Sequence, residues 1–591
     1  MTHLRLLSLL CLLVVAVIAG ESAPAPAFAR PKPASAPKPA RLAAEVGRIA
    51  VLPDKAPDCS TLKSIAESVT RGCTSNDDKA IAIYNFMNLS HYHFKGPNEL
   101  GGLPVLKEIN TYGWSLCGAL HAEQSALWRE LGWGWRFVGW DGHTTVEAQY
   151  DGRWHYLDVF LKYYAWMPDG AGGRTIAGQD DLAAKPKELV EDVCVLDPAR
   201  KVVYAKGSPP VADGKGRPWA VPFLSCGDLP ADVVGGVKTR KVAGSQEGWN
   251  DVVHATGNYS TDINLAPGLV LTNSWEPVKG ANYWNHTRYT QGHTCKRHPD
   301  TRNDPAFGLV LEPYTPVRRV RDWANGSIVF TADFTNDAWL ASLVACDNAR
   351  LADGALQPIA AEKPGVVVVQ LATPYVFAKG SAEVPEAEKV ELSWDGGASF
   401  VEVAAADFSE AIRGWSAVQL RISFRTPLKV LRVEGVFQNN PGALPYLSPG
   451  RNTVAVGVAD AKQLGRNRLV VTYAYRLGSR SKPLDELCVE GKEIAMGHAA
   501  TWDETITYAR KTFTAAELPA SFVIDCPTPK GRHPVYPRML FLQREIVGPN
   551  GTPAPLPAGA VEARPAAADE LQTLPNPFLV GSAAGDASIA R

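Results

Sequence analysis

Apolar residues follow helical spacing in two segments of the first half of the chain. In residues 77 to 90 (DDKAIAIYNFMNLS), positions 80, 83, 84 and 87 are apolar and Asp77 can serve as the N-cap. Residues 116 to 131 place leucines at positions 116, 120, 127 and 131 on one face, and Gly132 follows as a stop signal. The pattern therefore predicts two helices, with strand-like segments around them, in a mixed α and β region.

Beyond residue 260 the apolar positions form short runs of strand length, separated by turn residues. The clearest runs are VVVVQL (366–371), KVELSW (389–394), VQLRISF (418–424), KVLRVEGVF (429–437), LVVTYAYRL (469–477) and MLFLQREIV (539–547). Such spacing is typical of antiparallel β-sandwiches. We therefore predict a multidomain protein in which an α+β domain precedes all-β, sandwich-type domains.

Both ends of the chain differ from this pattern. Residues 6 to 19 (LLSLLCLLVVAVIA) form one apolar run behind Arg5, too short to span a membrane comfortably, and Ala27-Phe28-Ala29 supplies a cleavage pattern. This predicts a signal peptide and a secreted, periplasmic or cell-surface protein; an uncleaved anchor is the alternative. No later run is long enough for a membrane span, so none is expected after cleavage.

Changes in composition along the chain predict the boundaries between its parts. The predicted parts are the signal peptide (1–29), a Pro/Ala-rich linker (30–49), the α+β domain (50–230), a loop-rich β region (231–330), a β-sandwich-like domain (331–445), a second β region (446–547) and a disordered Pro/Ala-rich tail (548–591).

Charge and cysteine content restrict the function. The chain has 60 Lys and Arg against 61 Asp and Glu, so it lacks the overall positive field expected of a nucleic-acid-binding protein. Apart from Cys11 in the signal peptide, nine of the 10 cysteines remain, and an odd cysteine in an exported protein is a reactive thiol or an intermolecular partner. The simplest pairing is 59–73, 194–226, 295–346 and 488–526, which leaves Cys117 single.

Cys117 stands at the predicted start of the second helix, with Ser115 as a plausible cap. The positive end of a helix favours thiolate over thiol, and its free N–H groups could stabilise an oxyanion. Cys117 is therefore a candidate nucleophile; the alternatives are a small buried side chain or half of a disulfide. Trp114, three residues earlier, either lines the acyl pocket or packs in the core.

The segment HTTVEAQYDGRWHYLDV (143–159) predicts a hairpin with Asp151-Gly152 as its turn. If Tyr150 pairs with Arg153, Asp158 lies opposite Thr145 and diagonal to His143 on the same face, close enough to hydrogen-bond. A carboxylate that holds one imidazole nitrogen leaves the other for a thiol, which completes a Cys-His-Asp triad.

Non-catalytic roles remain open for these residues. The alternative for His143 is a surface histidine, and the alternative for Asp158 is a solvated charge. His155 should point to the opposite face, and His121, one turn after Cys117, is a possible neighbour of the site without a direct role.

Three segments, DDKAIAIYNFMNLSHYHF, GWSLCGALHAEQSALWRELGW and HTTVEAQYDGRWHYLD, resemble the transglutaminase-like superfamily over about residues 50 to 200. The resemblance implies a papain-like α+β fold, with Cys at the start of a helix packed on an antiparallel sheet and His and Asp on adjacent strands. It assigns these catalytic roles to Cys117, His143 and Asp158. Members include protein-crosslinking acyltransferases, cysteine proteases and peptide amidases, which all act through a thioester.

The resulting hypothesis is an exported cysteine enzyme that cleaves or transfers amide bonds of a peptide or protein, without a cofactor or a metal. Hydrolysis needs fewer special features than transamidation, but the sequence does not choose between them. The segment HTCKRH (293–298) has metal-ligating residue types, although its spacing matches no closed zinc motif. Residues 393–400 (SWDGGASF) resemble a structural Asp-box hairpin and hint at cell-wall or glycan contact. The alternative function is a non-catalytic extracellular scaffold or glycan-binding protein.

Overall fold

The computed structural model describes residues 39–93, 103–140, 143–161, 163–191, 194–197, 202–205, 223–225, 229–243, 259–283, 324–481, 500–574 and 576–579. The predicted signal peptide, the HTCKRH segment and Cys226, Cys295 and Cys488 lie outside these residues. Among the helices that the structure describes, none has the length and hydropathy needed to cross a bilayer.

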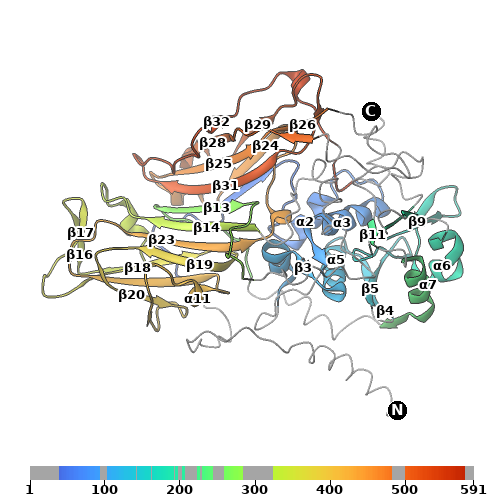
Figure 1. Ribbon diagram of the computed structural model, residues 1–591, viewed down its shortest axis with the longest axis horizontal. Coiled ribbons are helices and arrows are strands. Elements are labelled where there is room, and N and C mark those ends of the chain that lie inside the picture. Colours follow the sequence, from blue (N-terminus) through green and yellow to red (C-terminus); the bar gives the residue numbers. More distant parts are fainter. Residues whose placement is uncertain are drawn as a thin grey trace, which may run out of the picture. The chain divides into compact units, whose positions relative to one another are not determined.

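The first region combines helices with a small antiparallel sheet (Figure 1). Its helices are α2 (Leu62–Val69), α3 (Asn76–Ser90), α4 (Val105–Lys107), the π-helix η1 (Glu108–Tyr112), α5 (Cys117–Glu130), α6 (Gln179–Ala184), the π-helix η2 (Lys187–Glu191) and α7 (Leu229–Thr239). The sheet has the order β12 (Lys241–Ala243), β4 (Gly134–Trp140), β5 (His143–Tyr150) and β6 (Arg153–His155). Helix α5 packs on β5 and against α2 and α3, which places its first residue over the sheet.

Shorter elements complete this region. They are β2 (Tyr92–His93) with β3 (Trp114–Ser115), β7 (Trp166–Pro168) with β8 (Arg174–Ile176), and the sheet of β9 (Cys194–Asp197), β10 (Val202–Ala205) and β11 (Phe223–Ser225).

Both predicted helices are present, but their caps differ from the prediction. Helix α3 is capped by Ser75, whose side chain accepts from the backbone of Asp78, and not by Asp77. Helix α5 begins at Cys117 with no side-chain cap, because its N-cap residue is the apolar Leu116, and the Ser115 hydroxyl bonds to two buried glutamates instead. Leu116 is 43% exposed and not part of the buried face, since it precedes the helix.

The remaining described residues form several mainly antiparallel sheets, and each of the six predicted strand segments contains a strand, although in 429–437 the strand begins only at Arg432. The largest sheet has the order β19 (Val376–Glu383), β23 (Arg432–Asn439), β14 (Ala324–Thr331), β13 (Leu269–Ser274), β31 (Arg538–Val547), β25 (Arg468–Arg476), β28 (Thr507–Phe513) and β32 (Val561–Glu562). A five-stranded sheet contains β15 (Ala345–Asp347), β18 (Gly365–Ala372), β22 (Ala417–Phe424), β20 (Ala387–Ser393) and β21 (Val401–Glu402). The smaller sheets are β1 (Ala50–Pro53) with β24 (Gly450–Gly457) and β29 (Ala520–Cys526), β16 (Ala349–Ala352) with β17 (Ala355–Pro358), and β26 (Gly478–Arg480) with β27 (Ala500–Trp502) and β30 (His533–Pro534).

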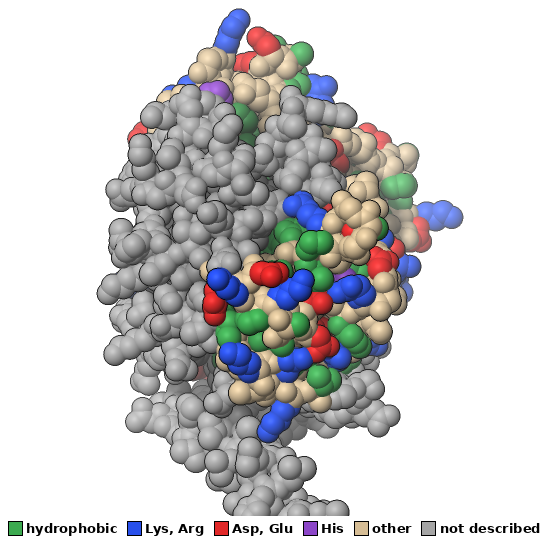
Figure 2. All heavy atoms as spheres, turned by 90° about the vertical axis from the view of Figure 1, so that its right-hand side faces the viewer, with side chains coloured by type: hydrophobic (Ala, Val, Ile, Leu, Met, Phe, Trp, Pro, Cys, Tyr) green, Lys and Arg blue, Asp and Glu red, His purple; other side chains and the backbone are tan. Residues whose placement is uncertain are grey.

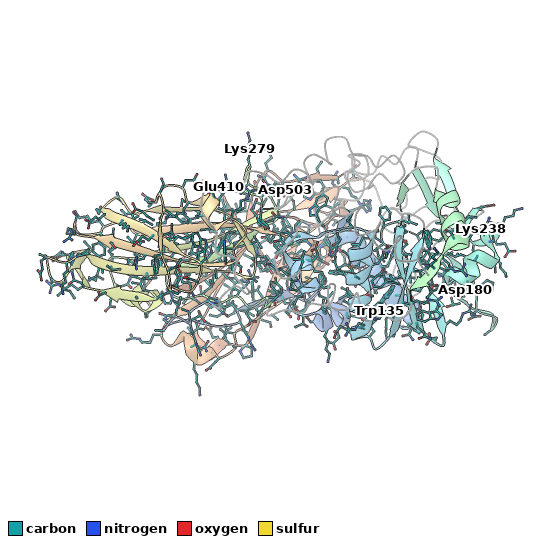
Figure 3. All side chains as sticks on the ribbon, turned by 90° about the horizontal axis from the view of Figure 1, so that it is seen from below. Trp135, Asp180, Lys238, Lys279, Glu410 and Asp503 are labelled. Carbon is teal, nitrogen blue, oxygen red and sulfur yellow. The ribbon has the colours of Figure 1, made fainter. Side chains whose placement is uncertain are left out.

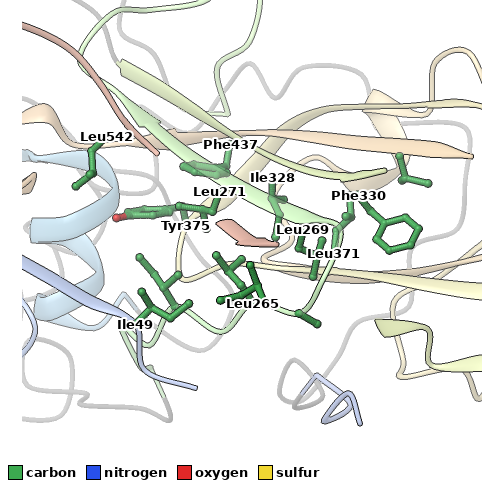
Figure 4. Close-up of a cluster of buried hydrophobic side chains, with 14 of the residues drawn as sticks. Ile49, Leu265, Leu269, Leu271, Ile328, Phe330, Leu371, Tyr375, Phe437 and Leu542 are labelled. Carbon is green, nitrogen blue, oxygen red and sulfur yellow. The ribbon is translucent and has the colours of Figure 1, made fainter. Parts of the chain in front are cut away.

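One apolar core joins these sheets (Figure 4). Leu271 and Ile328 come from the largest sheet, Leu371 comes from the five-stranded sheet, and Ile49 and Leu265 come from the segments before β1 and β13. All five side chains are at most 4% exposed. The molecule is thus a multi-sheet, β-rich α+β protein. The segment resembling an Asp-box is a structural hairpin between β20 and β21, in which the Asp395 side chain accepts a hydrogen bond from the backbone N–H of Ser399.

Sheet pairing crosses several of the predicted boundaries. The largest sheet takes strands from all three predicted β parts, and β12 extends the first region beyond residue 230. The described part of the predicted linker is not free, because Val46 is fully buried and bridges Leu265. A prediction based on average composition misses the few apolar residues that anchor such a segment.

The tail after residue 548, predicted to be disordered, is packed in its described part. Strand β32 pairs in parallel with β28, and Phe578 is 4% exposed. The Phe578 carbonyl accepts from the Asn85 side chain of α3 at 2.9 Å, and its ring lies 6.0 Å from that of Phe86. One buried aromatic residue thus holds a Pro/Ala-rich segment in place.

Asn440, directly after β23, ties the β-rich part to the segment that leads to Cys117. Its side-chain amide donates to the carbonyl of Ser90 at 3.0 Å and to that of Ile109 at 2.7 Å, and Asn440 is 2% exposed. Gly113 has φ 63° and lies so close that a Cβ would stand 2.5 Å from the Asn440 nitrogen. The residue before β3 must therefore be glycine.

We expect Asn440→Ala to destabilise the protein, because it leaves two buried carbonyls without donors, at a cost of about 2–4 kcal/mol. A thermal midpoint lower by several degrees, on the order of 5 °C, should result. Asn550→Ala, at an exposed asparagine, is the matched control and should leave the midpoint unchanged. Equal midpoints for the two variants would show that Asn440 does not brace this junction.

Among the described cysteines the pairing prediction fails at its first pair. Cys59 and Cys73 are both free thiols, so the 59–73 disulfide is wrong in this structure, and Cys346 and Cys526 are also free. Burial, the larger cause, raises the pKa of Cys73 to about 12, with Asp78 adding to the rise, so this thiol is not nucleophilic at neutral pH. Cys117 takes part in no disulfide.

Candidate active site

The Asp151-Gly152 turn sets the strand register at the site. Tyr150 pairs with Arg153, and Ala148 pairs with His155, as predicted from the two-residue turn. Asp151 and Gly152 both have positive φ, 49° and 74°, as a type I′ turn requires. Strand β6 ends at His155, so Asp158 lies three residues beyond the ladder and not opposite Thr145 in a strand pair.

His143 and Asp158 nevertheless meet. Nε2 of His143 lies 2.7 Å from Oδ2 of Asp158, and the Tyr156 hydroxyl donates to the same oxygen at 2.8 Å. Oδ1 accepts from the backbone N–H groups of Phe160 at 2.9 Å and Leu161 at 2.6 Å. The carboxylate is fully buried and held by these donors, so its direction relative to His143 is fixed.

Electrostatics keep this pair charged. Burial raises the pKa of Asp158, but the charges and hydrogen bonds of His121 and His143 outweigh it and hold that pKa well below its ordinary value. Burial lowers the pKa of His143, whereas Asp158, and then the Cys117 side chain, raise it to about 10. At neutral pH the His143 ring is therefore an imidazolium that is hydrogen-bonded to the ionised Asp158 carboxylate.

Cys117 interacts with the same imidazole. Because Nε2 is bound to Asp158, Nδ1 is the nitrogen left to face the thiol, and the Cys117 side chain interacts with His143 strongly enough to raise its pKa. Cys117 is half-buried and is the first residue of the 14-residue helix α5, where the helix dipole favours a thiolate. The structure therefore brings Cys117, His143 and Asp158 together.

Aromatic rings surround the imidazole. The centroid of the His143 ring lies 5.5 Å from that of Trp140 and 5.0 Å from that of Phe160, and both aromatic side chains are partly exposed. The indole N–H of Trp140 donates to Gln179 at 2.8 Å, which fixes this ring. Trp140 and Phe160 thus pack around the His143 ring, and the exposed Leu116 directly precedes Cys117 in the chain.

Two other predicted residues lie elsewhere. Trp114 is 2% exposed within β3, which matches the alternative role of core packing; as a substrate-binding residue it stays a prediction. His155 stacks on Tyr150 at 3.7 Å and bonds to the Ile176 carbonyl at 2.7 Å, on the face away from Asp158.

His121 is closer to the chemistry than the sequence indicated. Its Nε2 lies 3.3 Å from Oδ1 of Asp158, and its ring centroid lies 5.5 Å from that of His143. The spacing of one helical turn from Cys117 is the only sequence signal for this position, and it does not reveal which carboxylate the ring meets.

A second buried polar cluster lies beneath the start of α5. The Ser115 hydroxyl bonds to both Glu108 and Glu123, and Nε2 of His91 lies 2.8 Å from Glu123. Burial raises the pKa of Glu123 to about 8, although Ser115 lowers it. Ser115, two residues before Cys117, is thus held by two buried carboxyl groups, one of which is itself held by His91, and this fixes the path of the chain into the helix.

His121, His143 and Asp158 are also residue types that bind metal, and their donor atoms lie within 4.8 Å of one another. The observed contacts, however, have hydrogen-bond geometry: Oδ2 of Asp158 accepts from two side chains and Oδ1 from two backbone N–H groups. A metal at about 2.0–2.2 Å from each ligand would have to displace the protons of these bonds. The residues present therefore fit proton sharing better than a metal.

The surface around α6 and α7 carries side chains of both charges. Figure 2 shows acidic, basic and hydrophobic side chains interspersed on the described part of the face that includes α6 and α7. Asp180 of α6 and Lys238 of α7 lie at the same end of the molecule in Figure 3, and Asp180 forms an ion pair with Arg240.

A cavity of about 380 Å³ lies in the β-rich part of the protein, beside Asp503 and Arg564. Its lining includes none of the candidate site residues.

Comparison of the chain with protein-family models, with curated proteins and with solved structures finds no match.

Proposed function

We propose that this protein is an exported, transglutaminase-like cysteine enzyme with a papain-like catalytic domain that acts on amide bonds of a peptide or protein. The single observation that carries the proposal is the buried Asp158 carboxylate, 2.7 Å from Nε2 of a His143 ring whose pKa is also raised by the half-buried Cys117 side chain at a helix start. This is the order of nucleophile, base and orienting acid found in triad enzymes.

The geometry supports the following sequence of steps. The Cys117 thiolate attacks the amide carbonyl, and the N–H groups at the start of α5 stabilise the oxyanion that forms. The His143 imidazolium then gives its Nδ1 proton to the departing amine, which leaves a thioester on Cys117. Asp158 holds the ring and supports its positive charge.

Water or a second amine then attacks the thioester, with neutral His143 accepting the proton of the attacking group. Attack by water gives hydrolysis, and attack by an amine gives transamidation. We favour hydrolysis because it needs no second binding groove for an amine.

The test is the pH dependence of Cys117 alkylation by iodoacetamide, read by mass spectrometry on the peptide that contains it. An ion-paired Cys117 should react with a midpoint at least about two pH units below the roughly 8.5 of an ordinary thiol. Exposed Cys346 is the internal control, because burial and then Asp347 raise the pKa of this thiol. His143→Ala should return the Cys117 midpoint to the ordinary range.

A Cys117 midpoint equal to that of a simple thiol in the parent protein would contradict the enzyme proposal. The protein would then be a scaffold or a glycan-binding protein of the cell surface, the function that its β-rich part would serve alone.

A further inference from the structure

His121 has a buried ring whose two nitrogens both face acceptors. Nδ1 lies 2.7 Å from the carbonyl oxygen of Cys117 and 2.9 Å from that of Thr144. Carbonyl oxygens only accept hydrogen bonds, so Nδ1 carries a proton. Nε2 lies 3.3 Å from Oδ1 of the ionised Asp158, where a bare nitrogen lone pair would be repelled and an N–H is attracted.

We propose that His121 is a positioning residue that carries a proton on both ring nitrogens, and that it stabilises the Cys117 thiolate and ties the Cys117 carbonyl to strand β5. This inference rests on the proposed function and identifies a fourth member of the same site.

The charge count of the buried group supports this state. With His121 neutral, the Cys117 thiolate that the proposed function requires, the His143 imidazolium and the Asp158 carboxylate would leave one net negative charge at a largely buried site. With His121 cationic, two positive and two negative groups balance, which avoids an unpaired buried charge. Cys117 is half-buried, whereas His121 and Asp158 are both 0% exposed, so solvent screens the charges of these two side chains little.

The charged and titratable groups near His121 are few. They are Cys117 on α5, His143 on β5, Tyr156 and Asp158 after β6, and Tyr84 on α3, which faces Asp158. The other charges on packed elements are paired elsewhere: Lys63 with Glu67 on α2, Arg136 of β4 with Glu147, and Glu123 of α5 with His91. Asp158 is thus the carboxylate that lies beside the His121 ring.

Two variants separate the charge of His121 from its hydrogen bonds. In His121→Asn the amide nitrogen can replace Nδ1 and keep the bonds to the Cys117 and Thr144 carbonyls. In His121→Gln the longer amide can replace Nε2 and keep a neutral donor to Asp158. Both variants lose the positive charge, so both should raise the pH midpoint of Cys117 alkylation by about one unit.

A purely structural role would lower the thermal midpoint or the limiting alkylation rate without moving the pH midpoint. If the parent midpoint is low and both variants leave it unchanged or lower it, the proposed charge on His121 is wrong while the proposed function stands. If the parent midpoint is already that of an ordinary thiol, the proposed function fails first. A melting curve for each variant, compared with the parent, shows which of them is folded, and either folded variant suffices.

Discussion

Asp158→Asn should reduce the reaction of Cys117 at pH 6 with a thiol-directed substrate analogue by a large factor, on the order of 10²–10⁴. All five groups around this carboxylate are donors when both histidines are protonated. An asparagine amide has one oxygen and one NH₂ group, so in either orientation the NH₂ faces at least two donors. The imidazolium of His143 then loses both its partner and the charge that maintains it.

Asp151→Asn is the matched control, because it makes the same change in the same hairpin at an exposed residue with φ 49°, a conformation that asparagine also tolerates. It should react like the parent. Second-order rate constants for labelling of both variants, measured together with their melting curves, check the prediction. Parent-like reactivity of a folded Asp158→Asn variant would show that the carboxylate does not act through His143.

The stability of the protein should fall as pH rises from about 6.5 to about 10. His143 has its pKa raised to about 10 in the folded state, above the value of about 6.5 for an unfolded histidine. A raised histidine pKa stabilises the folded state fully below the unfolded value, and this contribution is lost as pH rises through the folded value. The contribution is on the order of a few kcal/mol, since one pKa unit corresponds to about 1.4 kcal/mol.

Asp158 gives the opposite dependence at the acid end. Its pKa is held well below the ordinary value, so its contribution is present above about pH 4 and is lost as pH falls further. The site should therefore stabilise the fold most between about pH 4 and 6.5.

Denaturation curves between pH 6 and 10 for the parent and for His143→Gln test the alkaline limb. The variant lacks the titrating imidazole, so its stability should change less over this interval than that of the parent. Parallel curves for the two proteins would show that the His143 pair carries no such linkage.

The amino-acid sequence alone was sufficient for the local features of the site. The helix that begins at Cys117 follows from a pattern within about 15 residues, and the Asp151-Gly152 turn sets the pairing of Tyr150 with Arg153. These short-range rules predicted His143 near Asp158, but the strand pairing ends at His155, so the observed contact also depends on the path of the chain after β6.

Only the tertiary structure shows which residues far apart in the sequence contact one another. The contact of His121 with Asp158 depends on how α5 lies on β5, and that angle results from packing against α2 and α3. Likewise, strands hundreds of residues apart share one sheet, and Phe578 anchors the tail against α3. Such pairings depend on competition among many similar apolar segments across the whole chain, whereas a turn or a helix start depends on a few neighbouring residues.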